Sequence, residues 1–233
     1  MSGWPRFLSD LIEQWPLIWI GLIHTLELTV VISISGFLWG IAIFYLKLSR
    51  LPWVRQLIDA YISFFIGMPL IVLLFLMYYG LPQWGIQMSP FTVAVIGFTM
   101  NVAAYNAAYM SAAYQGLDRD ELESAKAQGF SHRQIFSLIT LPQVLRLSVP
   151  ALTNQVINNL KDSSLAFLIQ YTEFFARIQE LAATNFQFFK AYLLAALVYL
   201  FFVSIIVLAA RRLESWVMIP GTYRTISNIG TIH

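Results

Sequence analysis

Two adjacent charged residues, Lys161 and Asp162, interrupt an otherwise apolar stretch of this sequence. A charge at the centre of a membrane-spanning helix costs about 2.5–3.5 kcal/mol on insertion scales, so such residues face a protein interior or a wet cavity. Adjacent helical residues point in different directions, so the two charges cannot fully satisfy each other. The pair either contacts a solute or is structural, with Asp162 capping a half-helix that begins near Ser163.

Asn101 and Tyr105 are two further candidates for contact with a solute. They lie at helical spacing with Ala108, so the three residues share one face of a predicted helix.

Gly67 and Pro69 are expected to loosen and kink the predicted helix around Phe65. Proline lacks a backbone donor, so the carbonyl of Phe65 loses its usual partner. The result is either a hinge or an ordinary packing bend.

The longest polar stretch, residues 117–147, predicts two short capped helices. Asp118 can cap the first, with Glu121 completing a capping box. Gly129 can end it in the left-handed conformation that helix C-termini often need. A linker has no need of two capped helices, so this stretch is typical of a docking element.

The second of these helices has its own signals. Ser131 can cap it with Gln134 as the box partner. The pair Leu141–Pro142 is then expected to break it.

The elements that position these residues are membrane spans, because 58% of the residues are hydrophobic and 11% are charged. A soluble domain carries about 25% charged residues. A span needs about 20 mostly apolar residues. We therefore predict an all-α membrane protein with about five transmembrane helices, at residues 17–46, 57–79, 91–113, 148–170 and 191–210.

Gly36 and Gly40 form a small-xxx-small pair that would let a neighbouring helix approach, or are incidental.

The basic residues predict the orientation. Ten Lys and Arg fall in the first and third connections and the C-terminal tail, which includes Arg224, against three on the other side. By the positive-inside rule, the N-terminus is outside and the C-terminus is cytoplasmic.

Several function classes are excluded or disfavoured. The sequence has no Gly-x-x-x-x-Gly-Lys-Ser/Thr stretch, so it lacks that device for cradling ATP phosphates. The absence of cysteine excludes thiolate metal sites, and three scattered histidines give no metal-ligand spacing. A net charge of +2 does not suggest nucleic acid. We expect neither an enzyme nor a metal site.

The polar stretch resembles the cytoplasmic signature of bacterial ABC importer permeases: Glu-Ala-Ala, three residues, Gly, nine residues, Ile, one residue, Leu-Pro. The matching residues are Glu123, Ser124, Ala125, Gly129, Ile139, Leu141 and Pro142, with serine in place of the first alanine. The resemblance implies that the first helix sits in a groove of a cytoplasmic ATPase, where small residues such as Ala125 and Ala127 allow close approach.

The resemblance points to the polar amino acid branch of these permeases. The residues that carry it are Gly67-Met68-Pro69-Leu70 after Tyr61, Ala103-Ala104-Tyr105, Leu141-Pro142-Gln143, Pro150, Asn154 and Leu160-Lys161-Asp162-Ser163-Ser164-Leu165. It implies that 1–233 is a single permease domain, in a multi-pass protein of the bacterial inner membrane that imports polar amino acids or related solutes. In this reading Lys161 and Asp162 bind the carboxylate and the ammonium group of an amino acid, respectively, or position residues that do.

The resemblance also implies partners: an ATPase dimer that binds ATP and Mg, a second permease subunit and an extracytoplasmic solute-binding protein. Three charges common in the branch are replaced here, by Ile66, Ala108 and Ser111. Either the solute lacks a cationic side chain, or this subunit is the non-binding half of a heterodimer, which we favour. The alternative class is a secondary transporter, which usually has an internal inverted repeat that this sequence does not display.

Overall fold

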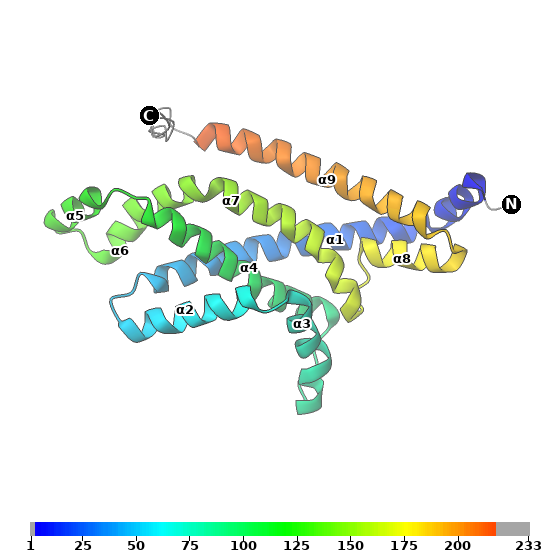
Figure 1. The fold of residues 1–233 in the computed structure, drawn as a ribbon, viewed down its shortest axis with the longest axis horizontal. Helices are drawn as coiled ribbons and strands as arrows, with labels where there is room; N and C mark the ends of the chain where they lie inside the picture. The colour runs from blue at the N-terminus through cyan, green and yellow to red at the C-terminus, as the bar shows by residue number, and fades with distance from the viewer. Residues whose placement is uncertain (1–2, 218–233) are drawn as a thin grey trace, which may run out of the picture.

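The computed structural model describes residues 3–217, and these residues form a helical protein (Figure 1). Arg224 lies outside the described residues. The α-helices are α1 (Trp4–Lys47), α2 (Pro52–Gly67), α3 (Leu70–Phe75), α4 (Pro90–Gln115), α5 (Arg119–Ala127), α6 (His132–Ile135), α7 (Leu141–Asp162), α8 (Phe174–Asn185) and α9 (Phe188–Val217). Short π or 3-10 segments follow three of them: η1 (Leu76–Gly80) and η2 (Leu81–Trp84) after α3, η3 (Phe136–Thr140) after α6, and η4 (Ser163–Ile169) after α7.

The expected spans correspond to long apolar helices. Four stretches within the described residues are long and apolar enough to cross a membrane: Trp4–Lys47, Pro90–Gln115, His132–Ile169 and Phe188–Ser215. A fifth is obtained if α2 and the Leu70–Trp84 segment are counted as one broken span. The prediction of about five spans is therefore confirmed.

The second span differs from the continuous helix expected over residues 57–79. The chain bends by 99° between α2 and the Leu70–Trp84 segment, which projects away from the bundle in Figure 1. Met68 is extended, with φ −92° and ψ 130°, because the residue before a proline is sterically disfavoured in the helical region. A kink near Gly67 and Pro69 was expected, but a break of the helix with a bend of 99° was not.

The centre of the bundle is the packing of α1 against α4. A Cβ built on Gly36 would lie 2.5 Å from Val102 Cγ1, and one on Gly40 would lie 2.8 Å from Asn106 Cβ. Neither contact leaves room for a side chain. The glycine pair therefore permits the close helix approach that its spacing suggested.

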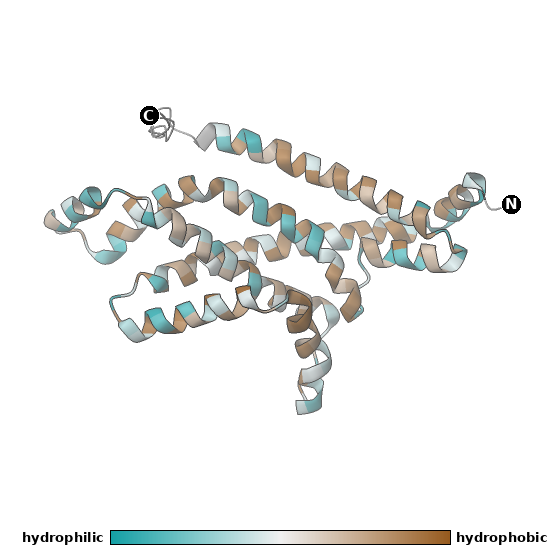
Figure 2. Ribbon diagram, viewed as in Figure 1, coloured by the Kyte–Doolittle hydropathy of each residue, from teal (hydrophilic) through white to brown (hydrophobic). Residues whose placement is uncertain are grey.

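The two ends of the bundle carry different elements. The α5–α6 region and the α1–α2 connection lie at one end, and the α8–α9 corner lies at the other, near the N-terminus (Figure 1). Brown, hydrophobic residues dominate α9, whereas α5 is largely teal (Figure 2). The two most basic connections thus share one end, as the orientation argument requires.

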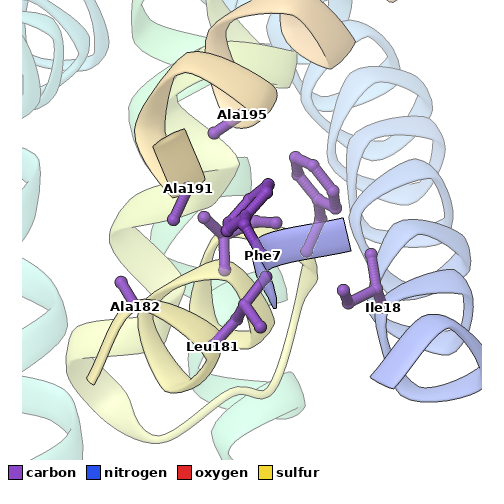
Figure 3. Packing of buried hydrophobic residues seen from close by; sticks show 8 residues of the cluster. Phe7, Ile18, Leu181, Ala182, Ala191 and Ala195 are labelled. Carbon is purple, nitrogen blue, oxygen red and sulfur yellow. The ribbon is translucent and has the colours of Figure 1, made fainter. Parts of the chain in front are cut away.

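A buried cluster holds the opposite end together. Phe7 and Ile18 of α1 pack there against α8 and α9, as Figure 3 shows. Beside it, the buried carboxylate of Glu173 accepts hydrogen bonds from the Thr25 hydroxyl at 3.0 Å and from the backbone N–H groups of Phe175 and Ala176 at 2.8 Å each. This carboxylate joins the start of α8 to α1.

Pro142 does not end a helix, contrary to the expectation. The chain runs from α6 through the π turn η3 directly into α7, and Pro142 is the second residue of α7. A proline ring and its missing donor are tolerated at the first turn of a helix. The wider π turn in front of Pro142 lets the helical path continue past it.

Candidate functional site

The docking element, residues 117–147, begins with a capped helix, α5. Asp118 accepts a hydrogen bond from the backbone N–H of Asp120 at 2.9 Å, as expected of an N-cap. Glu121 does not complete the capping box, and this part of the prediction is wrong. Its Oε2 instead accepts a hydrogen bond from Gln143 Nε2 at 2.7 Å. A tertiary donor has replaced the local one, and it ties α5 to α7.

The turn between the two helices has the geometry that its glycine indicated. Gly129 has φ +83°, the left-handed region where side chains are penalised. The N–H of Phe130 donates to the carbonyl of Ala125 at 3.1 Å, and that of Gly129 donates to Lys126 at 3.0 Å. These two bonds form a Schellman motif.

The second helix starts as predicted. The backbone N–H of Gln134 donates to Ser131 Oγ at 3.4 Å, and the backbone N–H of Ser131 donates to Gln134 Oε1 at 2.8 Å. This reciprocal pair is the expected capping box.

The signature residues of α5 lie on different faces. Glu123, Ser124 and Ala127 are exposed. Ala125 is buried against Leu122 and Ile135, so its small side chain permits packing inside the element rather than approach by a partner, which corrects the expectation for this residue. Of the remaining signature residues, Ile139 is half-buried beside this cluster, and Leu141 and Pro142 start α7.

A polar pocket lies where α2 breaks. It has a volume of about 410 Å³. Its wall is the Ile66–Leu70 segment, with polar side chains from α4 and α7 completing it: Asn101, Tyr105, Tyr109, Gln155, Asn158 and Asp162. Two of the four solute-pathway candidates, Asn101 and Tyr105, come from α4, and a third, Asp162, comes from α7.

Asn101 stabilises the break itself. Its Nδ2 donates to the carbonyl of Phe65 at 2.7 Å, the group that was expected to lose its helical donor to Pro69. A buried backbone carbonyl without a partner is costly. The asparagine of α4 thus supplies the missing hydrogen bond and fixes the end of α2 against α4.

Lys161 and Asp162 are separated by their helical positions. Both side chains are exposed, but Asp162 lines the pocket and Lys161 is not among the lining residues. Asp162 makes no side-chain cap, so the expectation that it caps a half-helix is wrong. The break at Ser163 does exist, because the helix narrows there into η4. Among the described residues that line the pocket, Asp162 is the one charged side chain.

Sequence reasoning missed Tyr109, Gln155 and Asn158. A signal was available for all three. Gln155, Asn158 and Asp162 recur at helical spacing on one face of α7, and Tyr109 follows Tyr105 by one turn. The same face continues into the bundle, since Gln155 Nε2 donates to Asn159 Oδ1 and Asn159 Nδ2 donates to Ser33 Oγ, each at 3.0 Å.

No group of three or more His, Cys, Asp or Glu suited to a metal ion occurs within residues 3–217. The pocket chemistry is therefore that of amides, phenols and one carboxylate. These groups can hydrogen-bond a polar solute and pair with a cationic group.

A bundle of apolar spans with a capped docking element at one end and a polar pocket at a broken span defines the transmembrane subunit of an ABC importer. Residues 35–218 match the binding-protein-dependent transport system inner membrane component, and the chain belongs to this family. It is accordingly a multi-pass protein of the inner membrane.

Several curated relatives are permease subunits for amino acids. The chain is 38% identical over 182 residues to the probable amino-acid ABC transporter permease protein PatM of Vibrio harveyi, covering 77% of each chain. It is 35% identical to YckA of Bacillus subtilis, with the same description, over 81% of this chain and 83% of the relative. It is 33% identical to the L-cystine transport system permease protein TcyB of the same organism, over 82% of each.

Solved structures have the same fold. A chain of an amino acid ABC transporter crystallised with histidines matches with a TM-score of 0.81 and 29% identity, over 90% of this chain and 97% of that one. A chain of the inward-facing MetNI methionine ABC transporter matches with a TM-score of 0.71 and 20% identity, over 89% and 99%. The second likeness concerns the fold alone.

Proposed function

We propose that this chain is the permease subunit of an ATP-driven, binding-protein-dependent importer of polar amino acids. It acts as a single permease domain and hydrolyses nothing itself. A cytoplasmic ATPase dimer binds ATP and Mg and moves the docking element. The family and the amino acid permeases among its relatives support this assignment over a secondary transporter.

One observation carries the proposal. α7 is one helix from Leu141, at the docking element, to Asp162, at the pocket, with Pro150 inside it. Gln143 near its start is bonded to Glu121 of α5, and Gln155, Asn158 and Asp162 near its end line the pocket. Because a helix is stiff along its axis, a displacement of α5 is transmitted to the pocket wall.

The docking residues have distinct proposed roles. Glu123, Ser124 and Ala127 present the exposed surface of α5 to the ATPase groove. Gly129 sets the angle between α5 and α6, and Ile139, Leu141 and Pro142 join the element to α7.

The pocket residues are proposed to form the solute pathway. Asp162 pairs with the ammonium group that every amino acid carries, and Tyr105 donates to its carboxylate. Asn101 acts as a positioning residue, because its Nδ2 is already engaged with Phe65. Lys161, exposed beside the pocket, attracts the carboxylate during entry or contacts a second subunit.

A second permease subunit completes the pore, and we favour a heterodimer. Ile66 and Ala108 stand where the resemblance to this branch implies charges, and Ile66 lines the pocket. A partner that retains such charges would bind the solute's side chain. The extracytoplasmic binding protein delivers solute at the end of the bundle that contains the α8–α9 corner.

The first test asks whether the docking element couples transport to ATP. Gly129→Pro forces φ near −65° on a residue that has φ +83°. The variant should insert normally but lose binding-protein-stimulated ATP hydrolysis. Full coupling in a properly inserted Gly129→Pro importer would overturn the proposal, as would failure of any ATPase to copurify.

The second test addresses the pocket. Asp162→Asn and Lys161→Met are compared in proteoliposomes for uptake and apparent affinity. We expect Asp162→Asn to weaken the apparent affinity and Lys161→Met to have the smaller effect. Normal uptake with unchanged affinity in both variants would rule out a binding role while leaving the docking proposal intact.

A further inference from the structure

Helix α1 is too long for a simple membrane crossing. It has 44 residues, and at about 1.5 Å per residue it extends over about 66 Å, more than twice the hydrocarbon thickness of about 30 Å. Part of it must therefore lie outside the hydrocarbon core. Pro16 lies within the helix, and proline bends a helix by removing a backbone bond. Figure 1 shows the stretch before it turning away from the rest of α1.

This N-terminal stretch, Trp4–Trp15, has an exposed apolar stripe. Trp4, Leu8, Ile12 and Trp15 are 52%, 48%, 74% and 50% exposed. Their spacing of three and four residues places them on one side of the helix. Large apolar side chains rarely gather in water without a partner.

The opposite side of the stretch is polar. Arg6, Ser9 and Glu13 are exposed and recur at spacings of three and four residues. A helix with one apolar and one polar exposed side has the pattern of a segment lying at a membrane–water boundary.

A third side is fixed to the protein. Phe7 is buried among residues of α8 and α9 (Figure 3). Asn185 Nδ2, at the end of α8, donates to Asp10 Oδ2 at 3.2 Å. Lys190 Nζ lies 5.2 Å from the centre of the Trp4 ring, a cation–π distance. The stretch is therefore held at the α8–α9 corner, partly through Trp4, whereas Leu8, Ile12 and Trp15 of the stripe remain exposed.

From the apolar, polar and protein-bound sides of this helix we infer that Trp4–Trp15 is an interfacial anchor. It lies in the lipid headgroup region and inserts its apolar stripe toward the acyl chains. Continuity with the span supports a lipid partner, because exposed Trp19 and Ile20 extend the apolar surface directly into the membrane-crossing part of α1. Tryptophan is enriched at such boundaries. The anchor would hold the α8–α9 corner at a fixed depth.

The chain contains no cysteine, so single labels can be placed on it without background from this chain, and any cysteines of the partner subunits are replaced beforehand. Leu8→Cys and Ile12→Cys test the stripe, and Ser9→Cys and Glu13→Cys are the matched controls one residue further on. All four positions are exposed, so the labels should be tolerated. Each spin-labelled variant of the full importer is reconstituted in phospholipid nanodiscs, and its accessibility to oxygen and to a water-soluble nickel chelate is measured.

We expect the ratio of oxygen accessibility to nickel-chelate accessibility to be several-fold higher for labels at positions 8 and 12 than for labels at positions 9 and 13. The labels at 9 and 13 should be more accessible to the nickel chelate. Two results would overturn the inference. If all four labels are more accessible to the nickel chelate than to oxygen, the stretch lies in water, free or as a binding surface for a protein partner. If the accessibility ratio is the same at positions 8 and 9 and the same at 12 and 13, but changes along the helix axis, the stretch is a continuation of the transmembrane helix.

Discussion

A single amide, that of Asn101, determines how the broken span is held. Replacing Asn101 with alanine leaves the Phe65 carbonyl without its donor at 2.7 Å. An unsatisfied buried polar group costs about 1–3 kcal/mol. Asn101→Ala should therefore lower the thermal unfolding midpoint of the purified importer, as measured by differential scanning fluorimetry. Asn158→Ala removes an amide from the same pocket and is the matched control, with a smaller expected shift.

Glu173 should give the protein a pH-dependent stability. Burial raises the pKa of Glu173 from 4.5 to about 7, against the opposing effect of hydrogen bonds from Phe175, Ala176 and Thr25. The folded state therefore holds a proton more tightly than the unfolded state between those values. Stability should fall as pH rises from about 5 through 7 and then level off.

The measurement is the unfolding midpoint as a function of pH for the wild type and Glu173→Gln. The variant cannot ionise at this position, so its midpoint should change less over the same range. Glu180→Gln, which alters an exposed carboxylate of the same helix, should retain the wild-type slope. An equal slope in Glu173→Gln would assign the pH dependence to other groups.

At the scale of elements, the α1–α4 contact requires the absence of side chains at Gly36 and Gly40. Gly36→Leu places atoms within 2.5 Å of Val102 Cγ1, and overpacking costs about 1–3 kcal/mol. The variant should show reduced yield and a lower unfolding midpoint. Gly80→Ala is the control, since a Cβ there meets nothing within 4 Å.

A second substitution, at Val102, tests whether the damage arises at the α1–α4 contact. Gly36→Ala combined with Val102→Ala removes the contacting Cγ1 atom and should recover part of the loss caused by Gly36→Ala alone. No recovery would indicate that the damage arises elsewhere than in the α1–α4 contact.

The docking element should depend on the conformation of Gly129 rather than on its size. Asparagine tolerates the left-handed region, whereas β-branched residues do not. Gly129→Asn should therefore retain most ATP-coupled uptake, and Gly129→Val should lose most of it. Equal loss in both variants would mean that a side chain at this position obstructs the ATPase, whatever its backbone preference.

The sequence predicted these elements well where the interacting residues are close to one another in the sequence. The cap at Ser131, the left-handed Gly129 and the kink near Pro69 all depend on residues within a few positions of one another. Predictions failed where a distant residue intervened. Glu121 bonds to Gln143, 22 positions away, instead of closing its own box. The 99° bend depends in part on Asn101, which belongs to another helix.

The pocket was predictable only in part for the same reason. Asn101, Tyr105 and Asp162 stood out as polar residues in apolar spans. Gln155 and Asn158 recur at helical spacing with Asp162, but this signal was missed because α7 has other polar residues along much of its length (Figure 2). Which side of a helix faces a pocket is decided by the packing of the whole bundle.

At the scale of the whole molecule, the orientation remains a prediction that the same cysteine-free background can test. Ser137, in the docking element, and Thr184, at the opposite end, are both exposed. In right-side-out vesicles, a membrane-impermeant maleimide should label Thr184→Cys and spare Ser137→Cys until the membrane is permeabilised. The reverse pattern would place the N-terminus inside.

The π turn at Phe136–Thr140 sets the rotational phase between the two ends of the molecule. Such a turn contains one residue more than an α-helical turn, so it rotates everything downstream by about 100° relative to an uninterrupted helix. The one additional residue of the π turn therefore fixes the angle about the helix axis between the docking element and the polar face of α7. Deleting Ser137 should therefore let the π turn close into an α-helical turn, with Gln155 and Asp162 still facing the space that they now line.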